Sequence, residues 1–250
     1  GYHVVILQSH DEYQREVVST QLLASRHIDG IIIAVSGETT DFCHLQSIMD
    51  RNIPMVMYDR VHDGIKTHKV VTDDYDGAFK AVTHLLEQGY RNIAHIGLSP
   101  NLSVTRNRLN GHREALKHYG LELPAKWIIH NNPDISLLES RISQLFSGAD
   151  APDALMIAGE RLVINCLRVC KRMKLRIPEE LGVVCFSDNP VTEFIGHGLT
   201  AVRQPTFDIG RKAAQMLIEL IEEKKVRRQY KTVRLSTVLD IQASSQRNKT

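Results

Sequence analysis

The sequence lacks the features of a membrane protein and of a charged, nucleic-acid-binding surface. No apolar run approaches the ~18 residues that a membrane-spanning helix needs. The formal net charge is only +2, from 31 basic and 29 acidic residues, so no surface for nucleic acid or lipid is indicated. Aromatic residues make up 6% of the chain and hydrophobic residues 42%, which is an ordinary composition for one large domain or two of modest size.

Cysteine is also scarce. The four cysteines are scattered, and only Cys166 and Cys170 lie one helical turn apart. That pair could suggest a metal site, but no second pair of Cys or His completes a tetrahedral set at usable spacing. Buried or interface thiols in a reducing compartment are therefore expected. No signal peptide is indicated, because Gly1-Tyr2 leads straight into an expected strand.

The motifs of the common enzyme classes are missing as well. The sequence has no nucleophile elbow, P-loop or zinc-protease motif, and no Gly-rich dinucleotide loop follows a strand. Its 12 histidines are dispersed. We therefore expect neither an enzyme nor a bound cofactor or metal. An enzyme built on this chain would have to use carboxylates at strand ends as acid and base.

What the sequence does contain is a regular alternation of apolar strands and helices. Uninterrupted apolar runs such as 31–35 are typical of parallel strands covered by helices on both faces. The helix 74–88 is closed by Gly89, and the helix 11–26 carries an apolar stripe of Val17, Val18, Leu22 and Leu23. This order predicts an α/β fold of right-handed strand–helix–strand units and doubly wound sheets. The expected strands are 3–8, 31–35, 53–60, 70–72, 93–98, 127–130, 155–158, 183–186, 199–202, 232–235 and 238–241, and the remaining expected helices are 39–51, 106–119, 136–146, 161–173 and 208–223.

The two halves of the chain align at a constant offset of 124 residues. The segment beginning at Asp29 falls on the one beginning at Asp153, and Ile53-Pro54 falls on Ile177-Pro178. Chance likeness of two ordinary segments is the alternative, but the constant register favours duplication. In the second half a strand and a helix, 93–98 and 106–119, precede the aligned region. Their counterparts would lie before residue 1, so we expect the first subdomain to lack one strand and one helix in this chain.

Polar side chains follow several strands at the point where each ends. The strand 53–60 ends on Asp59-Arg60, and its duplicated counterpart ends on Ser187-Asp188. Ligands of open α/β sheets bind beyond the carboxyl ends of the strands, so we expect these ends to face each other across a cleft that closes on a small polar molecule. Each charge could instead be a surface group or half of a structural ion pair. The candidate ligand-binding residues are His10, Tyr58, Asp59, Arg106, Arg108, Gly159, Glu160, Ser187 and Asp188.

Several ordered segments resemble a known family. They are IPMVMYDR (53–60), DGAFKAVTHLLEQGYRNIAHIG (76–97), RNRLNGHREALKHYGL (106–121), the segment 152–190 and LTAVRQPTFDIGRKAAQMLIELI (199–221). Together they resemble the effector-binding core of LacI-type transcription regulators over nearly the whole chain. Periplasmic sugar-binding proteins share this fold, but VRQP (202–205) and PEELGVVCFSD (178–188) are more similar to the regulators.

The resemblance implies a periplasmic-binding-protein-like fold of type I, with two parallel-sheet subdomains joined by three chain crossings. The expected subdomains are 1–91 with 203–226 and 92–202 with 231–243, followed by a loose tail, 244–250. The family implies a cytoplasmic homodimer that binds a small-molecule effector and controls operator DNA through an upstream helix-turn-helix. That helix-turn-helix is expected to be absent from this chain, and no membrane partner is expected. A periplasmic sugar-binding protein of a transport system is the alternative.

The resemblance also assigns roles to individual residues. The family's effector-gripping arginine, in an R-L-x-G motif, falls on Arg108, and its aspartate after the Ile-Pro strand falls on Asp59. The family's usual Asn-Asp pair is replaced by Gly159-Glu160, and its usual pair of aspartates by Ser187-Asp188. These departures remove an amide and a carboxylate that would bind sugar hydroxyls. The effector class is therefore open, with a carbohydrate as the expectation.

One helix, 161–173, resembles a dimer-face helix of the family. Its stripe of Leu162, Val163, Cys166 and Cys170 could form that face. Alternatively the same stripe packs against the sheet of its own subdomain. One stripe can serve only one of these purposes.

Overall fold

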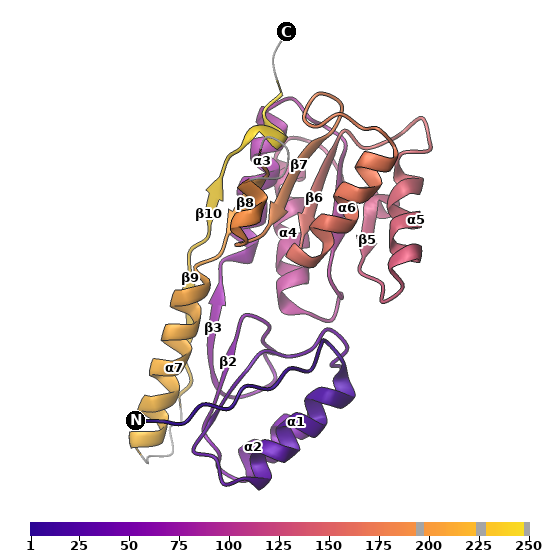
Figure 1. The fold of residues 1–250 in the computed structure, drawn as a ribbon. Coiled ribbons are helices and arrows are strands. Elements are labelled where there is room, and N and C mark those ends of the chain that lie inside the picture. Colours follow the sequence, from indigo (N-terminus) through magenta and orange to yellow (C-terminus); the bar gives the residue numbers. More distant parts are fainter. Residues whose placement is uncertain (194–197, 224–228, 248–250) are drawn as a thin grey trace. The chain divides into compact units, whose positions relative to one another are not determined.

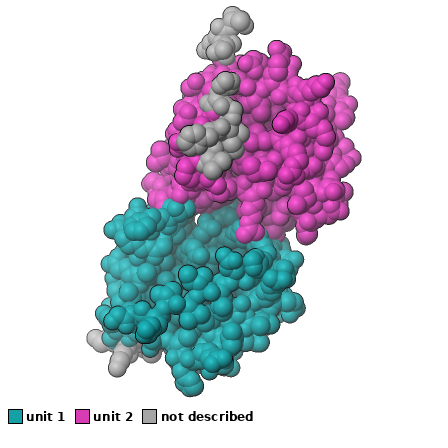
Figure 2. All heavy atoms as spheres, viewed as in Figure 1, with its two compact units in different colours: residues 1–72, 101–104, 206–235 teal, residues 73–100, 105–205, 236–250 magenta. Residues whose placement is uncertain are grey.

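The computed structural model describes residues 1–193, 198–223 and 229–247. Within these ranges the chain divides into two compact units (Figure 2). Unit 1 comprises residues 1–72, 101–104 and 206–235, and unit 2 comprises residues 73–100, 105–205 and 236–250. Among the helices of the described ranges, none is long and apolar enough to cross a membrane.

Unit 1 is built on a four-stranded sheet in the order β1-β2-β3-β9, in which each neighbouring pair is parallel. Its core forms where helix α7 packs Ile209, Ala213 and Met216 against Val56 and Val70 of the sheet. The strands are β1 (Ile31–Ile33), β2 (Met55–Tyr58), β3 (His68–Thr72) and β9 (Thr232–Leu235), and the helices are α1 (Tyr13–Ser25), α2 (Cys43–Asp50) and α7 (Thr206–Glu223).

Unit 2 is built on a six-stranded sheet in the order β10-β8-β7-β6-β4-β5, parallel except that β10 is antiparallel to β8. Helices α5 and α6 run side by side (Figure 1). The strands are β4 (Ile93–Gly97), β5 (Ile128–His130), β6 (Ala154–Ala158), β7 (Gly182–Phe186), β8 (Thr200–Arg203) and β10 (Val238–Asp240), the helices are α3 (Asp74–Glu87), α4 (Ser103–His118), α5 (Ile135–Leu145) and α6 (Glu160–Arg172), and the short 3₁₀ turns are Ala125–Trp127, Pro190–Glu193 and Ala243–Ser245.

The predicted α/β class with parallel, doubly wound sheets is confirmed. In unit 2 the order runs outward from β4 in both directions, to β5 on one side and to β6 and β7 on the other. Gly89, which was expected to close its helix, has a φ of +92° two residues after the end of α3. The Asp134 carboxylate accepts the backbone N–H groups of Ser136 and Leu137 at the start of α5. Gly111 lets α4 approach the Tyr75 carbonyl on α3, where a Cβ would collide with that oxygen.

The expected strand 3–8 is wrong as a strand. Residues 1–9 form no strand, and Val4, Val5 and Ile6 are 81%, 66% and 82% exposed. Under the duplication, this segment corresponds to β5 and β1 corresponds to β6. In unit 2 these two strands are joined by β4, which pairs with both. Unit 1 has no described strand in the equivalent place, so residues 3–8 have no ladder to join.

The same region overturns two further expectations. Helix α1 buries Glu16 and Thr20, whereas Val18 and Leu22 of the expected apolar stripe are exposed. In β1 only Ile31 and Ile33 are buried, and Ile32 is 39% exposed, so this strand is not covered on both faces. The physical reason is the same in each case, because an apolar face is buried only where another element packs on it.

The division of the chain also differs from the expected boundaries. Helix α3, expected in the first subdomain, belongs to unit 2 because Ala81, Val82 and Leu85 pack in one core with Met156 and Val184 of its sheet. Strand β9, expected in the second subdomain, belongs to unit 1 because it pairs with β3. Residues 224–226 of the expected first subdomain lie outside the described residues.

The expected loose tail is wrong over its first part. Ser244 and Ser245 are 3% and 0% exposed. The Ser244 hydroxyl donates to the Val183 carbonyl at 2.7 Å, and the Ser245 hydroxyl lies 2.6 Å from the Thr200 hydroxyl and 2.7 Å from Nε2 of His84. These hydrogen bonds fix the segment after β10 to unit 2. Residues 248–250 of the tail lie outside the described residues.

Candidate functional site

Arg108 lies where two strands of unit 2 end. Its Nε donates to Oδ1 of Asp74 at 2.7 Å, and its Nη2 lies 2.6 Å from the same oxygen. Its Nη1 donates at 3.0 Å to the carbonyl of Ala158, the last residue of β6. The guanidinium also lies 4.0 Å from the ring centroid of Phe186, the last residue of β7. Arg108 is thus placed at the carboxyl edge of the sheet, as predicted, but it is held there by three groups of unit 2.

This arrangement leaves Arg108 part of its hydrogen-bonding capacity. A guanidinium has five N–H donors, and those on Nη1 and Nη2 come in pairs. One N–H of each Nη atom is used by Ala158 and Asp74, so one on each remains. The residue is only 4% exposed. Arg108 can therefore still offer a ligand two donors, from a fixed position.

The other predicted residues of unit 2 gather at the same edge. Gly159 is the residue before α6, and a Cβ on it would lie 2.8 Å from Cγ of Leu98. Glu160 is exposed at the first turn of α6, and its Oε1 accepts from the Asn189 amide at 3.3 Å. Ser187 is buried and its Oγ accepts from the Asn189 backbone N–H, whereas Asp188 is exposed. Arg106 is exposed and donates to the Pro100 carbonyl at 3.3 Å.

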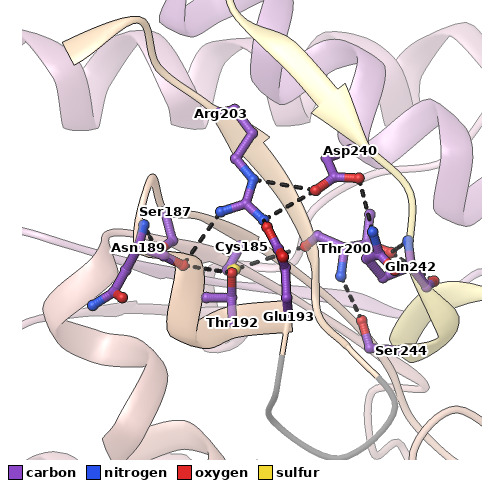
Figure 3. Close-up of polar contacts among 10 residues, drawn as sticks. All are labelled: Cys185, Ser187, Asn189, Thr192, Glu193, Thr200, Arg203, Asp240, Gln242 and Ser244. Carbon is purple, nitrogen blue, oxygen red and sulfur yellow. Dashed lines mark hydrogen bonds and ion pairs between the residues drawn. The ribbon is translucent and has the colours of Figure 1, made fainter. Parts of the chain in front are cut away.

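An arginine that the sequence did not single out fixes the loop after β7. Arg203, the last residue of β8, donates to the Asn189 carbonyl at 3.3 Å and to Oε1 of Glu193 at 3.3 Å (Figure 3). Its Nε and Nη2 both bond to Oδ2 of Asp240 on β10, at 3.2 and 3.0 Å. Gln242 supports Asp240 through its amide, at 2.9 Å from Oδ1. Arg203 therefore positions Asn189, the neighbour of Ser187-Asp188.

The predicted residues of unit 1 lie at the end of β2. Tyr58 is its last residue, and Asp59 follows with a φ of +53°, held by a 2.9 Å hydrogen bond from its backbone N–H to the Val70 carbonyl. Aspartate tolerates this left-handed conformation better than most residues. Across the described residues, the half-buried Asp59 carboxylate has no hydrogen bond or ion pair. His10 is exposed with a φ of +53°.

Two acidic residues organise the neighbouring loops of unit 1. The Asp11 carboxylate binds Nη1 of Arg60 at 2.5 Å and the Gly37 backbone N–H at 2.8 Å. Glu16, 4% exposed, accepts from the Ser36 N–H at 2.5 Å and the Thr39 hydroxyl at 3.0 Å, and lies 2.8 Å from Nε2 of His44. Neither residue was singled out from the sequence. Glu16 could have been found, because it lies one helical turn before Thr20, and two polar residues on one helix face can mark a buried hydrogen-bonding site. Arg60 is therefore occupied by Asp11, whereas the Asp59 carboxylate has no partner among the residues that the structure describes.

The four residues assigned to a dimer face lie instead in the core of unit 2. Leu162, Val163, Cys166 and Cys170 are between 0% and 3% exposed, on the side of α6 that packs against β6 and β7. A side chain already buried in its own unit cannot also form a subunit contact, so that assignment is wrong for these residues. The apolar side chain that α6 presents to solvent is Ile164, 54% exposed.

The buried cysteines carry no reactive thiolate. Burial raises the pKa of the Cys170 thiol to about 11 and that of Cys185 to about 12, and raises the pKa of Cys166 well above its ordinary value. Neutral thiols at these positions behave as small apolar groups. In the part of the chain that the structure describes, no three His, Cys, Asp or Glu residues gather to hold a metal ion.

Comparison with known proteins places this arrangement in context. The model of the family described as "Periplasmic binding protein-like domain" matches residues 82–245. The HTH-type transcriptional repressor CytR of Escherichia coli strain K12 is 28% identical, over 90% of this chain and 66% of its own length. The ribose operon repressor of Halalkalibacterium halodurans is also 28% identical, over 90% of this chain and 65% of its own. The solved complex of the transcriptional regulator CelR with cellobiose is 26% identical, with a TM-score of 0.83 over 93% of this chain and 71% of that one.

Proposed function

This chain belongs to the periplasmic binding protein-like domain family, and we propose that it is the ligand-sensing core of a LacI-type transcription regulator. The observation that carries the proposal is that the relatives are repressors, one named a transcriptional repressor and one the repressor of the ribose operon. The position of Asp59 directly after β2, and of the Arg108 guanidinium at the end of β6, agrees with the roles that the resemblance assigns to them.

The DNA-binding part of the function is a proposal about the whole protein. The chain spans about two thirds of the length of the curated relatives that it matches, and one of these is named for a helix-turn-helix. We propose that operator binding belongs to such a domain upstream of these residues, in the cytoplasm. We propose in the same way that an upstream strand and helix complete unit 1, which the exposure of Val4, Val5 and Ile6 supports.

The proposed effector is a small carbohydrate. One relative is named for the ribose operon and one structural neighbour holds cellobiose. Sugar hydroxyls suit carboxylates as acceptors and guanidinium N–H groups as donors. Within unit 1 we propose Asp59 and Tyr58 as effector-binding residues. Within unit 2 we propose the two remaining N–H groups of Arg108, together with Ser187 and Asp188. Gly159 and Glu160 directly follow β6, Arg106 lies in the first turn of α4 and His10 precedes α1, and all four remain candidates.

Replacement Asp59→Asn tests the effector site with little risk to the fold. Asparagine also adopts a positive φ, and no described residue depends on the Asp59 carboxylate. We expect D-ribose or, failing that, cellobiose to raise the melting temperature of the chain. Asp59→Asn should lower the affinity for that sugar by about 10- to 100-fold, because a hydrogen bond to a charged group is lost. Isothermal titration calorimetry measures this affinity.

The control for this test is Asp63→Asn, in the turn after β2. Its carboxylate is not among the predicted ligands, and the affinity should not change. Equal affinity of the Asp59→Asn variant and the parent would remove Asp59 from the site. If neither sugar shifts the melting temperature, the carbohydrate proposal is wrong.

We further propose a homodimer through the solvent face of α5 and α6. Arg168 of α6 binds Glu139 of α5 at 2.7 Å, and one turn later Arg172 donates to the Ser143 hydroxyl at 3.0 Å. The two helices therefore run parallel along this contact. The same register, continued one helical turn toward the N-terminus of both helices, places Ile164 of α6 beside Ile135 of α5. Ile135 is 52% exposed and Ile164 54%, which makes an apolar pair on the surface of unit 2.

The replacement Ile164→Glu is expected to convert a dimer to a monomer. A buried, unpaired carboxylate at the centre of an apolar contact would cost several-fold more than the contact contributes. Light scattering after gel filtration at micromolar concentration measures the mass. The matched control is Phe207→Glu, since Phe207 is 81% exposed at the start of α7 in unit 1, and this variant should stay dimeric. A monomeric parent chain, or a dimeric Ile164→Glu variant, contradicts the proposal.

A further inference from the structure

We propose that unit 2 carries a second ligand site, for a small aromatic carboxylate, in a cavity at the amino end of β5. The cavity has a volume of about 320 Å³ and is lined by the 3₁₀ turn before β5, the last turns of α5 and the loop that follows α5. That volume is at the small end of the ~300–1,000 Å³ typical of ligand pockets. The inference does not depend on the proposed function.

The lining of the cavity defines the body of the ligand. Trp127, Ile129 and Leu145 supply apolar surface, and Trp127 and Ile129 are 7% and 2% exposed, so they are fixed in the core of unit 2. An indole and two aliphatic side chains favour a planar apolar group, because such a group can lie against the ring and exclude water. The Gln144 amide, also in the lining, offers both N–H donors and an acceptor oxygen.

The charges around the cavity define the polar end of the ligand. Lys126 is neutralised by Asp150, whose Oδ2 lies 3.1 Å from its Nζ. Arg141 lines the same cavity, is exposed, and has no ion pair within the described ranges. The cavity thus has one uncompensated positive charge, carried by a fork of N–H donors. A carboxylate matches this fork in shape and in single negative charge.

This cavity is separate from the proposed effector residues of unit 2. Trp127 precedes β5, whereas Arg108 and Ser187 lie at the carboxyl ends of β6 and β7. The strands of this part of the sheet are parallel, so their amino and carboxyl ends lie at opposite edges. A ligand at Trp127 would therefore bind independently of one at Arg108.

Trp127 is the only tryptophan of the chain, so its fluorescence reports on this cavity. Titration of the full chain with benzoate should give a saturable change in tryptophan emission, and the neutral analogue benzamide should bind at least about tenfold more weakly. Arg141→Gln should weaken benzoate about tenfold or more. The control Arg113→Gln, an exposed arginine of α4 that does not line the cavity, should leave the benzoate affinity unchanged.

Three outcomes overturn the proposal. They are no saturable response to benzoate in the millimolar range, equal affinity for benzamide and benzoate, and an unchanged benzoate affinity in Arg141→Gln. Because Arg141 is exposed, its replacement should not disturb folding. Without ligand, Arg141→Gln should have the same tryptophan emission spectrum as the parent chain, which checks that the cavity is intact.

Discussion

Replacement of Arg108 by alanine is expected to destabilise unit 2 by about 3–5 kcal/mol. The side chains of Arg108 and Asp74 are 5% and 2% exposed, so their ion pair is buried. Removing the guanidinium leaves a buried carboxylate without this partner, removes a donor from the Ala158 carbonyl and exposes the face of the Phe186 ring. Urea unfolding followed by the fluorescence of Trp127, which also lies in unit 2, measures the free energy of unfolding.

The same variant cannot by itself show that Arg108 binds an effector, because a partly unfolded unit would also lose the ligand. A double-mutant cycle separates the two effects. Asp74→Asn removes the buried carboxylate, so the variant with both Asp74→Asn and Arg108→Ala should be more stable than the sum of the single losses predicts. If Arg108→Ala unfolds within about 1 kcal/mol of the parent, the ion pair is not an important part of the stability of unit 2.

Arg108 also shows what the sequence could and could not predict. Its motif placed it at the carboxyl edge of the sheet, and the structure puts it against the last residues of β6 and β7. Its partner Asp74 could not be predicted, because Asp74 belongs to a helix that was expected in the other subdomain. Strand and helix positions follow from local periodicity, whereas a pairing between distant residues depends on which elements pack together.

The other differences between expectation and structure have the same origin. The apolar pattern of α6 correctly marked one face as hydrophobic, but it did not tell whether Leu162 and Cys166 met their own sheet or a second subunit. The segment 3–8 has the composition of a strand, yet strand formation requires hydrogen bonds to a neighbour. For Asp59 local sequence was enough, because a polar residue directly after a buried strand lies at the edge of the sheet wherever the strand is placed.

Acidification is expected to destabilise unit 2 through a buried histidine pair. Nδ1 of His95 on β4 lies 3.1 Å from Nδ1 of His112 on α4, and both residues are 0% exposed. Nε2 of each ring is also buried and has no hydrogen-bond partner among the described residues. Two N–H groups cannot face each other across this contact, so the folded pair accepts at most one proton.

Burial lowers the pKa of His112 to about 3 from the ordinary 6.5. Burial, followed by the charges of His112, His130, Arg108 and Arg113, lowers the pKa of His95 well below that value. Both histidines are therefore neutral in the folded state at pH values where the unfolded chain is already protonated. Their stability contribution is fully present above pH 6.5 and is lost as the pH falls toward about 3.

For His112 alone, the free energy of unfolding is expected to fall by about 1.4 kcal/mol per pH unit below the ordinary histidine pKa, which amounts to about 2 kcal/mol at pH 5. His112→Gln keeps an amide that can bond to Nδ1 of His95 but cannot be protonated, so the slope of unfolding free energy against pH should fall by roughly this amount per unit. His118→Gln, at an exposed position of the same helix, should keep the parent slope. The difference between these two slopes isolates the buried imidazole from the carboxylates that also titrate in acid. Equal slopes for the two variants would show that the histidine pair takes up protons while unit 2 remains folded, and that its burial does not limit acid stability.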